Sequence, residues 1–200
     1  AAAQGRSRRE QSTGIMKDGT ITIRETASAD LAEIVRVHKE AFGYDKEAEL
    51  TAELLGDASA RPYLSLLALL DGKAVGHILF TRCRIEGAET AQNACYILAP
   101  LAVVPDCQRQ GVGGMLIGKG LKLLRERGAE LIFVLGHKEY YPRHGFIPGA
   151  GKLGFPAPYP IPEQHADYWM VQALSETGFT KFKGRVLCAA ALDRPEHWRE

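Results

Sequence analysis

The stretch that decides the fold is residues 100–128, PLAVVPDCQRQGVGGMLIGKGLKLLRERG. An apolar run ends at Val104, a short polar turn and a group of glycines follow, and the remainder has helical spacing. In that remainder Ile117, Leu121 and Leu124 fall on one stripe, and Gly128 is a typical helix stop. The pattern therefore predicts a strand, a loop and a helix in succession.

Glycines are concentrated where the predicted helix begins. Four of them lie in or near its first turns: Gly113, Gly114, Gly118 and Gly120. Each is disfavoured there by roughly 0.8–1 kcal/mol relative to alanine, so we interpret them as allowing a ligand to approach bare backbone. Unpaired N–H groups at residues 111–114 would favour an anionic ligand, typically a phosphate or pyrophosphate.

Two familiar phosphate-binding motifs fit this loop poorly. The dinucleotide fingerprint Gly-x-Gly-x-x-Gly fails because Leu116 stands where the third glycine belongs. The P-loop motif nearly fits from Gly113 to Lys119, but Gly120 follows where a Ser or Thr would hold magnesium. A nucleotide-phosphate binder therefore stays open as a residual alternative.

A third motif, Gln-x-x-Gly-x-Gly, is filled by Gln108, Gly111 and Gly113, directly after Leu-Ala-Val-Val-Pro. Together with YYPRHGF at residues 140–146, it resembles the GNAT superfamily of acyl-CoA-dependent N-acetyltransferases. YYPRHGF and a later YWMVQAL at residues 168–174 look more narrowly like its YhbS-like branch. The resemblance covers about residues 20–190.

The expected fold is α/β (α+β), with a single mixed, mostly antiparallel sheet of about seven strands and helices on both faces. The family resemblance implies a V-shaped splay between the fourth and fifth strands, and Pro100 in the fourth is expected to mark a bulge. Helices are expected between Ser28 and Gly43 and from about Lys46 to Leu55. The expected strands are 21–24, 63–70, 75–85, 94–104, 131–135, 169–174 and 183–192.

Composition indicates one globular domain, because 200 residues with 46% hydrophobic content can bury a sizeable core. We place this domain at residues 18–200 and expect residues 1–17 to be a disordered basic tail or an artificial extension. The tail carries a net +3 and the whole chain +1, which leaves the domain at −2.

These charges favour neither a nucleic acid nor a membrane as a partner, and no apolar run is long enough to cross a bilayer. The four cysteines lie far apart, without Cys-x-x-Cys spacing, which is typical of reduced cytoplasmic thiols rather than disulfides or a zinc site. No metal is expected, because the chain lacks His-Glu-x-x-His and paired acids at metal spacing.

The resemblance implies a binding site for acetyl-CoA as co-substrate. Its pantetheine amides would pair with the free backbone of Leu101, Ala102 and Val103, as an added strand would. The thioester carbonyl would meet the N–H of Val103. The pyrophosphate would bind at the loop and helix start, formed by Gln108, Arg109, Gln110, Gly111, Val112, Gly113 and Gly114.

The resemblance also implies the catalytic acid, because the family motif Tyr-x-x-x-Gly-Phe places its tyrosine at Tyr141. Phe42 and Tyr44 are expected acceptor contacts, with His137 as a further candidate. The base is open: residues 94–104 contain no acid, and His137, Glu139 or a water relay could serve. The proline-rich residues 149–167 are expected to form a lid over the acceptor site.

The expected activity is therefore transfer of an acetyl group from acetyl-CoA to a primary amine of a small molecule or peptide, by direct attack in a ternary complex. The alternative is a non-catalytic acyl-CoA-binding or regulatory module, suggested by the missing strand carboxylate. Many GNAT proteins dimerise, so a homodimer is also allowed. The acceptor, acyl groups larger than acetyl and the oligomeric state are left open by the sequence.

Overall fold

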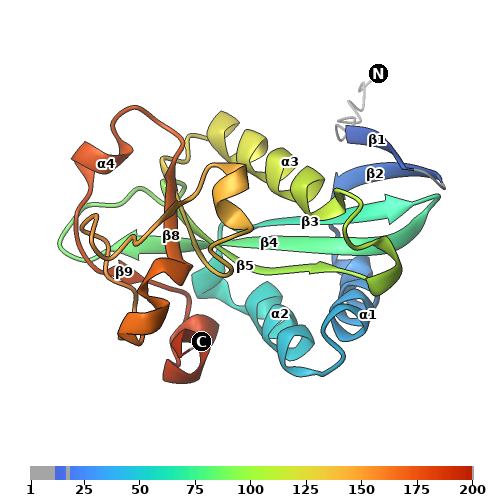
Figure 1. Cartoon of the computed structure of the whole chain (residues 1–200), viewed down its shortest axis with the longest axis horizontal. Helices are drawn as coiled ribbons and strands as arrows, with labels where there is room; N and C mark the ends of the chain where they lie inside the picture. Colours follow the sequence, from blue (N-terminus) through green and yellow to red (C-terminus); the bar gives the residue numbers. More distant parts are fainter. Residues whose placement is uncertain (1–11, 17–18, 200) are drawn as a thin grey trace, which may run out of the picture.

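A mixed β-sheet forms the centre of the protein (Figure 1). The computed structural model describes residues 12–16 and 19–199. Within them the sheet order is β1-β2-β3-β4-β5-β6-β8-β7, and β9 pairs with the end of β4. All neighbouring strands are antiparallel except β5 and β6. The strands are β1 Ser12–Met16, β2 Gly19–Glu25, β3 Leu64–Leu70, β4 Lys73–Ile85, β5 Cys95–Val103, β6 Leu131–Leu135, β7 Ile147–Pro148, β8 Trp169–Ala173 and β9 Val186–Leu187.

All seven predicted strands are present, although the last shrinks from residues 183–192 to the two residues of β9. The described residues add β1 and the short β7, which the sequence did not indicate. Strand β1 falls within residues 1–17, the range expected to be a disordered tail, so the sheet begins earlier than expected. The rest of that tail prediction, residues 1–11 and 17, lies outside the described residues.

Helices cover both faces of the sheet, as predicted. Figure 1 shows α3 on one face and α1 and α2 on the other. Gly43, at φ 74°, ends α1 in the left-handed conformation that glycine adopts readily. The α-helices are α1 Leu31–Phe42, α2 Lys46–Gly56, α3 Val112–Glu126 and the short α4 Gly178–Lys181. The 3-10 helices are η1 Ser28–Asp30, η2 Ala58–Ala60, η3 Pro105–Cys107, η4 Tyr141–His144, η5 Glu163–Tyr168, η6 Ala190–Leu192 and η7 Pro195–Trp198.

Helix α3 lies very close to the sheet, which fixes the position of its first turn. The Cα of Gly120 is packed directly against the ring of Phe80 on β4, where a Cβ atom would overlap the ring. A Cβ at Gly76 on the same strand would likewise lie 3.0 Å from the Leu116 side chain of α3. The glycine at position 120 is therefore required by helix–sheet packing and not by a ligand.

The predicted splay lies between β5 and β6. The two strands pair only from Cys95 to Leu98, and beyond that point β5 continues to Val103 without β6. The predicted bulge is also present, because Ile78 opposes Leu101 while Phe80 opposes Leu98, and Pro100 is one of the two residues between. The bulge and the parting of the strands therefore coincide.

The proline-rich residues 149–167 pack onto the sheet instead of forming the expected lid. Ala150 and Phe155 are completely buried, and Trp169 donates its Nε1–H to the carbonyl of Phe155 at 2.8 Å. None of the residues 149–167 lines the cavity described below. Among the described residues, no helix is both long and apolar enough to span a membrane.

Candidate active site

A cavity of about 550 Å³ opens where β5 and β6 separate. Five parts of the chain line it: the junction of α1 and α2, the bulged part of β5, the end of β6 with the following turn, the end of η5, and the C-terminal segment. From the first three come Phe42, Tyr44, Lys46, Glu47, Leu50, Ile97, Leu98, Ala99, Pro100, Leu101, Leu135, Gly136, His137 and Tyr141. From the last come Leu192, Glu196, His197 and Trp198, and Tyr168 completes the lining.

The free edge of β5 faces the splay. Hydrogen-bonded and non-hydrogen-bonded pairs alternate along antiparallel strands, and Val104 donates its N–H to Val75 of β4 at 2.9 Å. Ala102 therefore pairs its backbone groups with β4, whereas Leu101 and Val103 turn theirs toward the gap. Two of the three residues expected to offer backbone groups thus do so.

The loop before α3 is held by its own side chains. Gln108 donates its side-chain N–H to the carbonyl of Val103 at 2.8 Å, which ties the loop to the end of β5. Gln110 donates in the same way to the carbonyl of Asp106 at 2.9 Å. Both glutamines therefore act on the protein's own backbone in this structure, and what remains for a ligand is backbone N–H.

Two residues of the loop adopt the left-handed conformation. Arg109 has φ 60° and Gly111 has φ 88°. For a residue with a Cβ this costs about 1–2 kcal/mol, and such strain is concentrated at ligand-binding and catalytic sites. Gly111 precedes the first turn of α3, whose leading N–H groups have no acceptor within the helix. The arrangement suits an anion at the helix start.

The reasons for the glycines differ from those inferred from the sequence. A Cβ at Gly113 would lie 2.5 Å from the hydroxyl of Tyr140, and one at Gly114 would lie 3.0 Å from the ring of His144. These two glycines therefore let α3 pack against η4 and its preceding residue. At Gly111, in contrast, nothing lies within 4 Å of the Cβ position, so this glycine faces open space.

The P-loop alternative is not supported by this geometry. Residues 113–119, which would form the phosphate loop, lie within α3. Lys119 is 8% exposed and stands two turns inside the helix instead of at its start.

Tyr141 is positioned by close packing and lines the cavity. It is 9% exposed, its ring lies edge-on to Phe146 at 5.8 Å between centroids, and Gly136 packs directly against it. Burial raises the pKa of Tyr141, so the hydroxyl stays protonated at neutral pH. Within residues 12–16 and 19–199 this hydroxyl makes no hydrogen bond, which leaves it available as a proton donor.

The three expected acceptor contacts, Phe42, Tyr44 and His137, all line the same cavity as Tyr141. The rings of Phe42 and Tyr44 are 6.0 Å apart. Glu139, one of the two side chains considered as a base, does not line the cavity. The structure thus brings together side chains that are about a hundred residues apart in the sequence.

Sequence reasoning missed the cavity residues of the C-terminal segment, which include Glu196, and it missed Glu47. Glu47 reaches the cavity from the first turn of α2, and Glu196 reaches it from η7. Neither carboxylate could be recognised from the sequence as a cavity residue, because acidic residues are common in the first turn of a helix.

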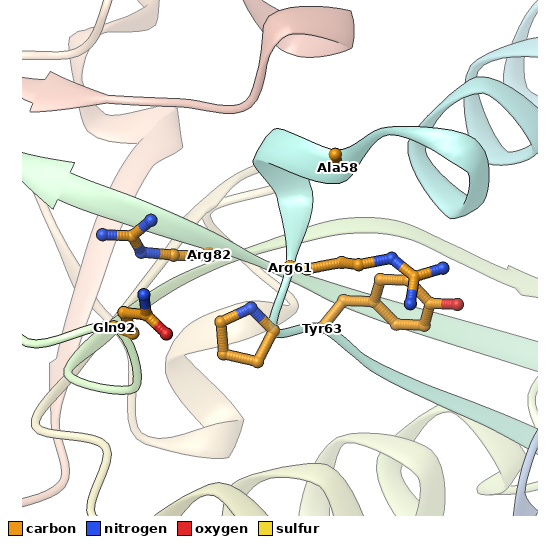
Figure 2. Close-up of a pocket in the computed structure, with 6 residues that line it drawn as sticks. Ala58, Arg61, Tyr63, Arg82 and Gln92 are labelled. Atoms are coloured by element: carbon orange, nitrogen blue, oxygen red, sulfur yellow. The ribbon is translucent and has the colours of Figure 1, made fainter.

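A second, larger hollow of about 690 Å³ is not a candidate for the same chemistry. It is lined by Ala58, Arg61, Pro62, Tyr63, Arg82 and Gln92. Figure 2 shows that the side chains of Arg61 and Arg82 point away from each other. The guanidinium of Arg61 lies over the ring of Tyr63 at 5.2 Å, and no residue predicted from the sequence lines this hollow.

The chain is similar in sequence to known N-acetyltransferases. Residues 31–146 match the model of the Acetyltransferase (GNAT) family. The chain is 54% identical over 168 residues to the N-acetyltransferase YjhQ of Escherichia coli K12, covering 84% of this chain and 92% of that protein. It is 30% identical over 125 residues to the N-acetyltransferase YhbS of the same strain, covering 62% of this chain and 72% of that protein.

Two solved structures are similar over most of the chain. A GNAT acetyltransferase from Brucella melitensis in complex with acetyl-CoA has a TM-score of 0.67 at 32% identity, covering 86% of this chain and 98% of that one. Escherichia coli YhbS in complex with CoA has a TM-score of 0.76 at 23% identity. The match covers 94% of this chain and 96% of that one, and the two proteins share the fold.

Proposed function

Because the chain belongs to the GNAT family of acetyl-CoA-dependent N-acetyltransferases, we propose that it transfers an acetyl group to a primary amine by direct attack in a ternary complex. The acceptor is an amine of a small molecule or a peptide. The observation that carries this proposal is that the open edge of β5 and the hydroxyl-bearing Tyr141 meet at one cavity. An acyl donor on that edge and an amine in that cavity would then be in contact.

The residues present fit acetyl-CoA. The carbonyl of Leu101 and the N–H of Val103 pair with the two pantetheine amides, since Gln108 occupies the carbonyl of Val103, and Ala102 supports them through its pairing with β4. The N–H groups from Arg109 to Gly114 bind the pyrophosphate, with open space at Gly111 for its approach. Gln108 and Gln110 hold the loop in shape. The similar Brucella protein has acetyl-CoA bound, which supports acetyl-CoA as the ligand of this chain.

The chemistry needs a proton donor, a stabilised oxygen and a proton acceptor. Acetyl-CoA supplies the reactive thioester. The amine nitrogen bonds to the carbonyl carbon, the carbon–sulfur bond breaks, and Tyr141 donates its hydroxyl proton to the sulfur. We place the oxygen-stabilising N–H at Leu101 instead of Val103, because Leu101 lines the cavity with Tyr141 and Val103 does not.

The amine must also lose a proton, which returns to the phenolate of Tyr141 or to solvent. Of the two side chains considered from the sequence, His137 lines the cavity and Glu139 does not. His137 therefore remains an acceptor contact and a candidate base, alongside a water relay. Phe42 and Tyr44 form the apolar wall against which the acceptor lies.

The test is a thiol-release screen of primary amines with acetyl-CoA, run beside a thermal shift with CoA. We expect acetyl-CoA to raise Tm and at least one amine to release thiol. The Gly111→Asp variant serves as the binding-deficient control. Binding of CoA with no thiol release across a broad panel of amines would instead support the non-catalytic alternative and contradict the proposal.

A further inference from the structure

The acceptor cavity has a wall that no strand or α-helix of the core provides. Glu196, His197 and Trp198 of η7 line it from the side facing α2, and we call these three residues the C-terminal turn. Figure 1 shows the end of the chain beside α2. The site is the whole cavity, which Tyr141 and the bulge of β5 also line.

The C-terminal turn is anchored at both of its ends. Trp198 is 2% exposed, donates its Nε1–H to the carbonyl of Leu192 at 2.9 Å and lies edge-on to Trp169 at 5.4 Å. Arg194, just before the turn, forms an ion pair with Glu53 of α2 at 2.8 Å. These contacts fix the backbone of the turn beside the cavity that Glu196 lines.

The charges that line the cavity are predominantly negative. Glu47 and Glu196 approach it from α2 and from the C-terminal turn, and Lys46 is the one cation among the lining side chains. Burial lowers the pKa of His197, so this ring is neutral at pH 7. Arg194 and Glu53, whose charges also act on His197, form an ion pair with each other.

The uncharged walls of the cavity are largely aromatic. Phe42, Tyr44, Tyr168 and Trp198 all line it, in addition to Tyr141. Aromatic faces attract cations, and attraction increases where water is excluded. The negative charge and the aromatic walls therefore favour the same kind of ligand.

We propose that the C-terminal turn determines acceptor specificity and selects an amine that carries a second positive charge, held by Glu196 together with Glu47. This inference rests on the proposed acetyl transfer and names its substrate class. The first nitrogen of such an acceptor reaches the thioester beside Tyr141, and the nitrogen at its other end stays an ammonium beside Glu196. An acceptor with a carboxylate at that end is repelled.

The test uses three probes of one length that differ only in the far group: putrescine, n-butylamine and γ-aminobutyrate. A second set with six carbons, hexamethylenediamine, hexylamine and ε-aminocaproate, covers a longer reach. Values of kcat/KM are expected to fall from diamine to monoamine to amino acid in at least one set. Added salt should reduce this difference, because it screens charges that are partly exposed to solvent.

Glu196→Gln should lower kcat/KM for the diamine by about threefold to fivefold, the range of a partly exposed ion pair, and leave the monoamine and the KM for acetyl-CoA unchanged. Glu47→Gln should also lower kcat/KM for the diamine. Glu49→Gln is the matched control, because Glu49 is exposed on α2 and does not line the cavity. An equal loss with all three probes would show a merely structural role and overturn the proposal, as would a preference for the amino acid.

Failure of the acetyl-transfer proposal can be recognised separately. If acetyl-CoA binds and no amine releases thiol, that proposal fails, and calorimetry with the same probes on the CoA-saturated protein decides the specificity. Diamine binding that Glu196→Gln weakens would support the charge selection. Absence of any difference between diamine and monoamine would overturn it.

Discussion

Nε2 of His38 lies 2.8 Å from Nδ1 of His77, and both rings are completely buried. His77 also contacts the hydroxyl of Ser65 at 2.8 Å, which links α1, β4 and β3 through three polar side chains. The ring of His38 is also stacked on Phe42, which lines the cavity at the splay, at 6.1 Å between centroids. The apolar wall of the cavity therefore rests on a buried histidine pair.

This pair predicts a loss of stability on acidification. Burial lowers the pKa of His38 to about 4 and that of His77 well below its usual value. The unfolded chain binds more protons between about pH 6.5 and 4, so stability falls as pH decreases through that range. For His38 alone the loss approaches about 3 kcal/mol. Urea unfolding at pH 7, 6 and 5 should show it, and His38→Leu should reduce the slope. An unchanged slope in that variant would contradict the assignment.

Tyr141→Phe should lower kcat by about a hundredfold or more, the usual contribution of a proton donor. Because the hydroxyl makes no hydrogen bond within the described residues, Tm and CoA binding should stay nearly constant. Thiol release and calorimetry measure the two effects. Tyr63→Phe is the matched control, since Tyr63 lines the other hollow. Full turnover in Tyr141→Phe would exclude this tyrosine as the essential acid.

Gly111→Asp should abolish CoA binding, because it places a carboxylate and a side chain where the pyrophosphate is expected. The control is Gly87→Asp, which lies in the turn between β4 and β5, has a similar φ of 78° and has nothing within 4 Å of its Cβ position. Both changes carry a similar conformational cost, about 1 kcal/mol. Calorimetric titration with CoA should show loss of binding in the first variant only. Equal affinities in the two variants would place the pyrophosphate elsewhere.

Gly120→Ala and Gly118→Ala should change stability in opposite directions. The added methyl at position 120 overlaps the ring of Phe80, a strain that typically costs about 1–3 kcal/mol. At position 118 nothing lies within 4 Å, so alanine should stabilise α3 by about 0.5–1 kcal/mol. Thermal unfolding of the two variants measures both effects. A stabilised Gly120→Ala protein would show that α3 does not pack as closely as described.

The sequence predicted the strand, loop and helix around residues 100–128 because each part has a local signal. The apolar run, the turn residues and the helical spacing all act over short distances. The bulge at Pro100 was predictable for the same reason, since a proline cannot donate to a sheet. The splay was predicted from the GNAT resemblance, which the family match confirms.

Other features depend on contacts between distant residues, which have no local signal. Nothing near Gly113 indicates that Tyr140 packs against it, so its role was assigned to a ligand. His38 packs against His77, which lies on another element and is 39 residues away in the sequence. The C-terminal turn was missed because an irregular segment has no periodicity that would place it at the cavity.

The position of the splay has a consequence for how the protein tolerates unpaired backbone. Strand edges at the rim of a sheet are places where other chains can attach and aggregate. The unpaired part of β5 is instead enclosed, because β4 pairs with its other side and β6 is joined to it from Cys95 to Leu98. A strand of another protein would have to insert between two strands of the same sheet, whereas a narrow, extended ligand can enter where β5 and β6 separate. The protein thus keeps unpaired backbone groups for a ligand without exposing them to strands of other proteins.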